Sequence, residues 1–77
     1  MKLVEAIGQR VSTLLKEKNF TLYKLQAKGG VPRSTVSDVI LVKKKRVSTD
    51  TIYQICDTVG ITLREFFDDT IFDEVDD

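Results

Sequence analysis

The 77-residue sequence contains no histidine and only one cysteine, Cys56. A single cysteine cannot form an internal disulfide, and without a second cysteine or a histidine it lacks the partners of a zinc site. The sequence also has no phosphate-binding loop and no paired carboxylates in an evident cleft. We therefore predict that the protein is not an enzyme, needs no cofactor or metal, and buries Cys56 as a small apolar side chain.

Long hydrophobic stretches are missing as well. No segment approaches the roughly 18 consecutive apolar residues that a membrane-spanning helix requires. The apolar residues near the start are interrupted by Glu5, Gln9 and Arg10, which is unlike a secretory signal peptide. The lone cysteine suits a reducing compartment. These absences predict one small cytoplasmic domain with no membrane partner, whose modest core would be helped by oligomerisation.

Net charge is also missing, because 12 basic and 12 acidic residues cancel over the whole chain. The two signs are nevertheless separated. Residues 1–50 hold 11 lysines and arginines and 4 acidic residues, a net charge of +7, whereas residues 51–77 carry −7. Uneven charge can simply solvate a surface. The local field decides binding, however, so the first 50 residues are expected to attract a polyanion.

The spacing of the apolar residues predicts five helices and an all-α fold. The predicted helices cover about residues 3–18, 22–28, 32–40, 49–59 and 63–67. Asn19 is expected to stop the first helix and Gly60 to end the fourth. Ser48 is expected to cap the fourth helix, and Thr62 and Glu65 are expected to form a capping box at the fifth.

The segment from Thr21 to Val42, TLYKLQAKGGVPRSTVSDVILV, predicts two short helices hinged at a pair of glycines. Thr21 is a suitable N-cap for the first helix. One of Gly29 and Gly30 can supply the left-handed backbone that ends it, and Pro32 suits the first turn of the next helix. The segment is therefore expected to form a helix–turn–helix pair.

The second helix of this pair is expected to have one apolar and one polar face. Val36, Val39 and Ile40 recur at helical spacing and should turn inward. The residues left on the outer face are Arg33, Ser34, Ser37 and Asp38. Such side chains can form hydrogen bonds with base edges or phosphates, and the helix can fit the major groove of DNA.

The end of the chain is interpreted as an acidic tail, residues 69–77, that follows a domain of residues 1–68. A solvated or frayed terminus is the preferred interpretation, since chain ends are often poorly ordered. Ile71, Phe72 and Val75 leave a second interpretation open. In that interpretation these apolar residues contact a partner or a second copy of the chain.

The helix order and two strings of residues resemble the Cro and phage-repressor type, or XRE-like, helix-turn-helix family. The strings are GVPRSTVS at residues 30–37 and ICDTVGITLREFF at residues 55–67. The resemblance covers about residues 6–68 and implies a compact five-helix, lambda-repressor-like fold. It also implies a cytoplasmic, nucleoid-associated transcription regulator of bacteria or phages that binds double-stranded DNA as a homodimer.

The resemblance assigns base contacts to Arg33, Ser34 and Asp38. The guanidinium of Arg33 can bond the O6 and N7 atoms of a guanine together, with a phosphate contact as the alternative. The Asp38 carboxylate is expected to accept from a cytosine amino group or to orient Arg33 or a lysine; alternatively it solvates the helix and repels wrong sequences. Backbone contacts are assigned to Thr21, Tyr23, Lys24, Thr35, Ser37, Lys43, Lys44, Lys45 and Arg46.

Three positions depart from the family pattern. Leu22 replaces a glutamine that often binds phosphate. Gln26 replaces a common alanine, which predicts a change in how closely the second and third helices approach. Leu41 and Val42 replace Asn-Gly, and a β-branched residue such as Val42 resists the positive φ that glycine accepts. We therefore expect the third helix to run longer or its exit loop to differ.

Together these features predict a sequence-specific DNA-binding transcriptional regulator, a repressor by family habit, that inserts residues 32–40 in the major groove. The alternative is a protein–protein interaction module of the same fold, which docks a partner through its acidic C-terminal end. Leu22 and Asp38 favour that alternative.

Overall fold

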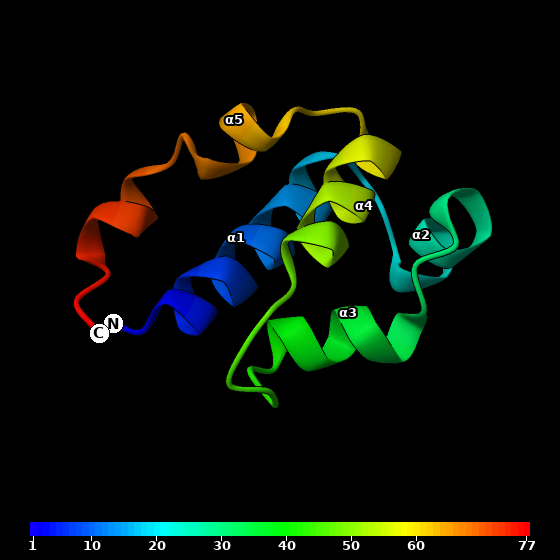
Figure 1. Ribbon diagram of the computed structural model, residues 1–77. Helices are drawn as coiled ribbons and strands as arrows, with labels where there is room; N and C mark the ends of the chain where they lie inside the picture. The colour runs from blue at the N-terminus through cyan, green and yellow to red at the C-terminus, as the bar shows by residue number, and fades with distance from the viewer.

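The computed structural model describes all 77 residues, and its regular structure is entirely helical (Figure 1). The helices are α1 (Leu3–Glu17), α2 (Leu22–Gly29), α3 (Arg33–Ile40), α4 (Thr49–Val59), α5 (Leu63–Phe67) and the 3-10 helix η1 (Thr70–Glu74). The prediction of an all-α, five-helix fold is confirmed, and η1 follows the five expected helices. No helix is both long and apolar enough to reach across a lipid bilayer.

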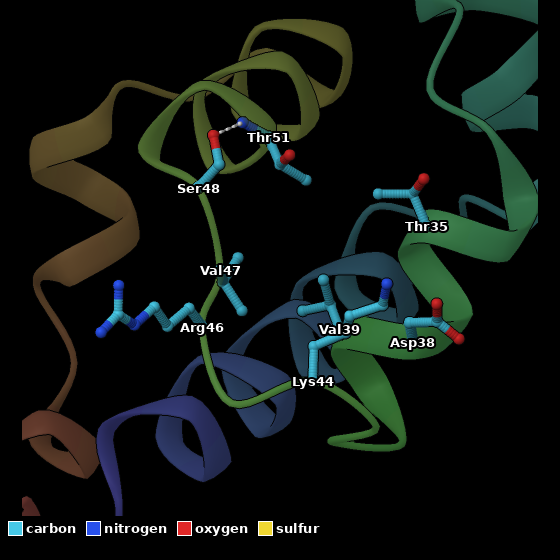
Figure 2. Close-up of a pocket in the computed structure, with 8 residues that line it drawn as sticks. All are labelled: Thr35, Asp38, Val39, Lys44, Arg46, Val47, Ser48 and Thr51. Atoms are coloured by element: carbon cyan, nitrogen blue, oxygen red, sulfur yellow. Dashed lines mark hydrogen bonds between the residues drawn. The ribbon is translucent and has the colours of Figure 1, made fainter.

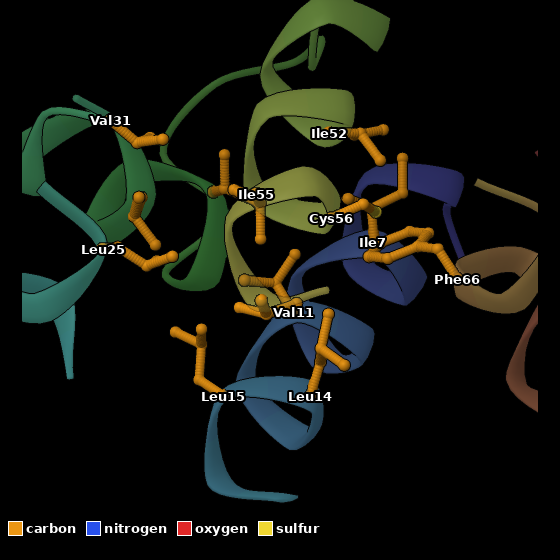
Figure 3. Close-up of a cluster of buried hydrophobic side chains, with 13 residues drawn as sticks. Ile7, Val11, Leu14, Leu15, Leu25, Val31, Ile52, Ile55, Cys56 and Phe66 are labelled. Carbon is orange, nitrogen blue, oxygen red and sulfur yellow. The ribbon is translucent and has the colours of Figure 1, made fainter. Parts of the chain in front are cut away.

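Apolar side chains from all five α-helices meet in one core (Figure 3). The buried members are Ile7, Val11, Leu14, Leu15, Leu25, Val31, Val36, Val39, Ile52, Ile55, Cys56, Val59 and Phe66. Leu25 and Phe66 lie on opposite sides of this cluster, with α1 and α4 between them. Cys56 is fully buried, and burial raises the pKa of its thiol. Cys56 is therefore the small buried apolar residue that the sequence predicts.

The ends of α4 and α5 lie where the capping residues predict them. The Ser48 hydroxyl accepts hydrogen bonds from two amides of the first turn of α4, at 3.1 and 3.4 Å. Thr62 and Glu65 exchange two hydrogen bonds of 3.0 Å in a capping box. The bond from the Thr62 amide lowers the pKa of the Glu65 carboxyl. Gly60 ends α4 with a φ of +88°, a left-handed conformation that glycine adopts without strain.

Two glycines allow helices to pack with their backbones close together. A β-carbon on Gly8 would stand 2.7 Å from the carbonyl oxygen of Val39, so α1 and the end of α3 leave no room for a side chain. A β-carbon on Gly29 would overlap the side chain of Thr58, where α2 meets α4. Gln26 is exposed and does not separate α2 from α3, which pack against each other.

The C-terminal segment folds against α1, which corrects the interpretation of a frayed tail. η1 packs on α1, and the two ends of the chain lie together (Figure 1). Asp69 caps η1 by accepting from the Ile71 amide at 2.9 Å, and Phe72 packs against the core. The Leu3 amide donates to Asp77 Oδ1 at 3.1 Å. The tail's apolar residues are therefore partly buried, while a domain boundary at residue 68 stays a prediction.

Arg10 of α1 holds α5 and the tail together. Its Nε donates to the carbonyl oxygen of Phe66 at 2.7 Å, and a terminal nitrogen donates to that of Glu65 at 3.1 Å. The guanidinium lies 5.6 Å from the centre of the Phe66 ring and 3.8 Å from the Asp69 carboxylate. Because carbonyls at the end of a helix lack partners within the helix, Arg10 serves as the C-terminal cap of α5.

Candidate nucleic-acid interface

Three residues, Gly30 to Pro32, connect α2 with α3. The Thr21 hydroxyl caps α2 by accepting from the Lys24 amide at 3.1 Å, as predicted. Gly30 supplies the left-handed backbone, with φ +70°, and the fully buried Val31 anchors the turn in the core. Pro32 is the N-cap of α3 rather than its first helical residue, so the predicted start is one residue early. The result is the expected helix–turn–helix pair.

The two faces of α3 differ in burial as the sequence predicts. Val36 is fully buried and Val39 is 7% exposed. On the other side Arg33 and Ser34 are exposed, whereas Thr35, Ser37 and Asp38 are half-buried. Figure 1 shows α3 along an outer edge of the molecule, on the same side as the loop that leads to α4. The polar face of α3 is therefore open to a large ligand.

The exit from α3 corrects the expectation about Val42. The Lys43 amide donates to the carbonyl of Asp38 at 2.9 Å and the Val42 amide to that of Val39 at 3.3 Å, the two bonds of a Schellman turn. Val42 therefore has φ +56° although it is β-branched, and α3 ends at Ile40 instead of running longer. A left-handed backbone costs a residue with a β-carbon roughly 1–2 kcal/mol.

This turn brings the basic loop back beside α3. A hollow of about 180 Å³ lies between α3, the loop and the start of α4 (Figure 2). Its lining residues are Thr35, Asp38, Val39, Lys44, Arg46, Val47, Ser48 and Thr51. In Figure 2 the Lys44 side chain extends toward α3 and Asp38, whereas the Arg46 side chain points away from α3. The hollow therefore presents a carboxylate, an ammonium and hydroxyl groups together.

Residues 10–70 match the family model of the Cro/C1-type HTH DNA-binding domain. The chain belongs to this family. The match includes the helix pair, the basic loop, α4 and α5, and it confirms the resemblance on which the site residues rest. DNA is the partner that the family indicates, and such domains are typically without enzymatic activity. Searches of curated proteins and of solved structures gave no match to the chain.

On α2 of this Cro/C1-type domain, the expected phosphate-binding residues lie near the helix start. Tyr23 is 69% exposed, and Lys24 is exposed with its ammonium 4.8 Å from the centre of the Phe20 ring. This cation–π contact holds the Lys24 side chain near the start of α2. Leu22 is partly buried against the core, so its departure from the family pattern serves packing.

The basic loop of the Cro/C1-type domain keeps its charge free. The four cations from Lys43 to Arg46 are exposed, and none takes part in the chain's three ion pairs. Lys43, Lys44 and Lys45 also line a second depression with Lys2, Glu5 and Asp77, so two acidic side chains stand near the loop without forming an ion pair with it. Cations without ion-pair partners, next to a helix that can fit the major groove, are well placed to bind phosphates of the DNA backbone.

Several residues that line these two depressions were not among the predicted site residues. Ser48 and Thr51 line the hollow beside α3, and Lys2 lines the second depression. The sequence marks Ser48 as a helix cap, but no local signal places it near α3. Conversely, Arg33 does not line the hollow, so the three predicted base-contacting residues are not gathered in one place.

Proposed function

We propose that the protein is a sequence-specific regulator of transcription, acting as a repressor, that binds double-stranded DNA with α3 in the major groove. The observation that carries this proposal is the polar face of α3 beside a loop of four cations that have no partner within the chain. The family match supports DNA as the ligand. A repressor bound at a promoter excludes the polymerase.

In this proposal Arg33, Ser34 and Asp38 contact bases. Arg33 is exposed at the first position of α3 and carries no ion pair, so its fork of donors is free for a guanine. Contacts with the DNA backbone come from both sides of α3: Thr21, Tyr23 and Lys24 on α2, Thr35 and Ser37 on α3, and Lys43, Lys44, Lys45 and Arg46 in the loop. Backbone contacts fix the register, and base contacts specify the sequence.

The test begins with selection of bound duplexes from a random pool. Arg33→Ala should weaken binding to the selected duplex by about tenfold or more and leave binding to random duplexes nearly unchanged. Lys45→Met should weaken both alike and reduce the salt dependence by about one counterion. Equal losses on both duplexes for Arg33→Ala would show that it only clamps a phosphate.

Failure to bind any duplex at low salt, where phosphate contacts are strongest, would reject the proposal. That result would favour the protein–protein interaction module, with the acidic C-terminal end docking a basic partner.

We also propose a homodimer that joins through α5. Phe67 is 42% exposed, and its ring centre lies 5.0 Å from those of Phe66 and Phe72. The exposed ring is therefore held in place by two neighbouring rings. A two-fold dimer would place its two α3 helices about one helical turn of DNA apart, roughly 34 Å, and select a palindrome. Light scattering should show a dimer that Phe67→Ser dissociates. Leu3→Ser, which changes a similarly exposed residue on α1, should leave the dimer intact.

A further inference from the structure

Asp38 is an isolated carboxylate within a basic stretch of the chain. Between Glu17 and Asp50 it is the only acidic residue among eight lysines and arginines. A carboxylate that faces a polyanion repels it unless a donor stands between them. The three ion pairs of the chain do not include Asp38, so no cation of the protein neutralises it by direct contact. Its position on the outer side of α3 therefore requires an explanation in the complex.

The turn after α3 brings one particular lysine to Asp38. The carbonyl of Asp38 accepts a hydrogen bond from the Lys43 amide at 2.9 Å, and the left-handed backbone of Val42 reverses the chain. Lys44, the residue after Lys43, therefore lies beside α3. Asp38 and Lys44 line the same hollow, together with Thr35 (Figure 2). Since the two charges form no ion pair with each other, both stay free to bind a third group.

We propose that Asp38 and Lys44 act as a pair that recognises one G·C base pair, which rests on the proposed insertion of α3 in the major groove. There the guanine presents the acceptors O6 and N7, and the cytosine presents the N4 amino donor. Lys44, which the proposed function counts among the backbone contacts, here donates to the guanine instead, while Asp38 accepts from the cytosine. The carboxylate thereby gains the donor that offsets its repulsion from phosphate.

The same pair of side chains rejects A·T in the same orientation. Thymine presents its O4 acceptor and a methyl group where the carboxylate requires a donor. Two acceptors facing each other leave the half-buried Asp38 carboxylate without a partner, which is costly. Arg33 lies outside the hollow and reads a different base pair. The domain thus has two separate points of base recognition, one at each end of α3.

The experiment measures affinity for the selected duplex and for each of its single base-pair substitutions. The proteins compared are the wild type and the variants Asp38→Ala, Lys44→Met, Lys45→Met and Arg33→Ala. We expect the wild type to prefer G·C at one position by about tenfold or more. Asp38→Ala and Lys44→Met should both lose that preference at that same position. Preferences elsewhere in the site should stay unchanged in these two variants.

Lys45→Met is the matched control, because it removes the same charge from the same loop but does not line the hollow. It should weaken binding to all duplexes alike and keep every preference. The double variant of Asp38→Ala with Lys44→Met should discriminate no less than either single variant, because the two residues act as a unit. In the variants that keep Arg33, the preference at the base pair read by Arg33 shows that the domain is folded and docked, and Arg33→Ala identifies that base pair.

The inference is overturned if Asp38→Ala and Lys44→Met alter preferences at different base pairs, or if the shared base pair is A·T. It is also overturned if Lys44→Met behaves like Lys45→Met, since Lys44 is then a phosphate contact only. If the wild type binds no duplex even at low salt, the proposed function fails and this inference fails with it. That outcome differs from the others because no variant then needs to be compared.

Discussion

The basic loop after α3 and the acidic end after α5 are both rich in charge, yet they relate to the rest of the chain in opposite ways. Residues 43–46 are exposed, have no ion pairs and follow a residue with a strained φ. The segment of α5 and the acidic end, residues 63–77, is tied to α1 by Arg10 and by η1, and its phenyl rings contact one another. Charge that finds partners within the chain stabilises the fold, whereas charge without partners stays available to an external ligand.

Both regions rest on α1, which explains how so small a domain keeps them apart. Gly8 allows the end of α3 to approach α1 closely, and Arg10, two residues later, faces α5 and the tail. Residues two apart on a helix point to different sides. One side of α1 thus supports the proposed DNA interface. Another side carries the contacts of Arg10 with α5 and the tail, which we call the clasp.

The largest expected effect comes from removing the ring of Phe66, which Arg10 contacts at the centre of this clasp. Phe66→Ala should lower the free energy of unfolding by about 3–5 kcal/mol, because the ring is fully buried and its loss leaves a cavity. Phe67→Ala removes the same ring from a 42% exposed position and should cost far less. Urea unfolding of both variants measures the difference. A cost for Phe66→Ala as small as that for Phe67→Ala would mean that this end of the chain contributes little to the core.

Arg10→Met tests the clasp without opening a cavity. It should lower the free energy of unfolding by about 1.5–3 kcal/mol, because two carbonyls at the end of α5 lose a charged donor. Lys45→Met, which removes a cation from the basic loop, should change stability by less than about 0.5 kcal/mol. Chemical denaturation gives both values. Equal losses in the two variants would erase the proposed distinction between the two regions.

Val42→Gly addresses the strained side of the comparison. Glycine adopts φ +56° freely, so the variant should gain about 1 kcal/mol of stability while DNA binding is unchanged. The neighbouring Leu41→Gly should instead lose roughly 0.5–1 kcal/mol, because Leu41 has φ −85° and glycine there only adds freedom to the unfolded chain. Thermal unfolding compares them. A loss of stability in Val42→Gly would show that the valine side chain matters more than the backbone strain.

The smallest expected effect is the loss of stability at low pH when the Glu65 carboxylate is protonated. The hydrogen bond from the Thr62 amide holds the pKa of Glu65 below its ordinary value, so the ionised carboxylate stabilises the folded state. This contribution is complete above the unfolded pKa and disappears as the pH falls through the lowered folded value. Glu65→Gln keeps an acceptor oxygen but cannot titrate. Between neutral pH and about pH 3, its melting temperature should therefore fall less than that of the wild type.

Local patterns were sufficient for much of the fold. The stripe of apolar residues in α1 and the caps at Thr21, Ser48 and Thr62 predicted their elements correctly, because each signal lies within a few residues of the structure it specifies. Gly30 likewise ended α2 as expected. The polar and apolar faces of α3 followed from the same helical period.

Two features of the structure, the left-handed turn at Val42 and the packing of the tail on α1, were not predicted. The strained φ of Val42 contradicts its local preference and is held by bonds to the end of α3. The tail appeared frayed in the sequence because its acidic residues have no local partner, whereas Arg10 stands at the opposite end of the chain. The contacts with DNA bases and phosphates stay predictions.

By itself the sequence determined the helices, their caps and the separation of charge, since these depend on spacing and residue type. Only the tertiary structure decided that the basic loop is free and the acidic end is bound, and that Lys44 shares a hollow with Asp38. The physical reason is that the interaction energy of a charge depends on its distance from other groups, and packing sets these distances.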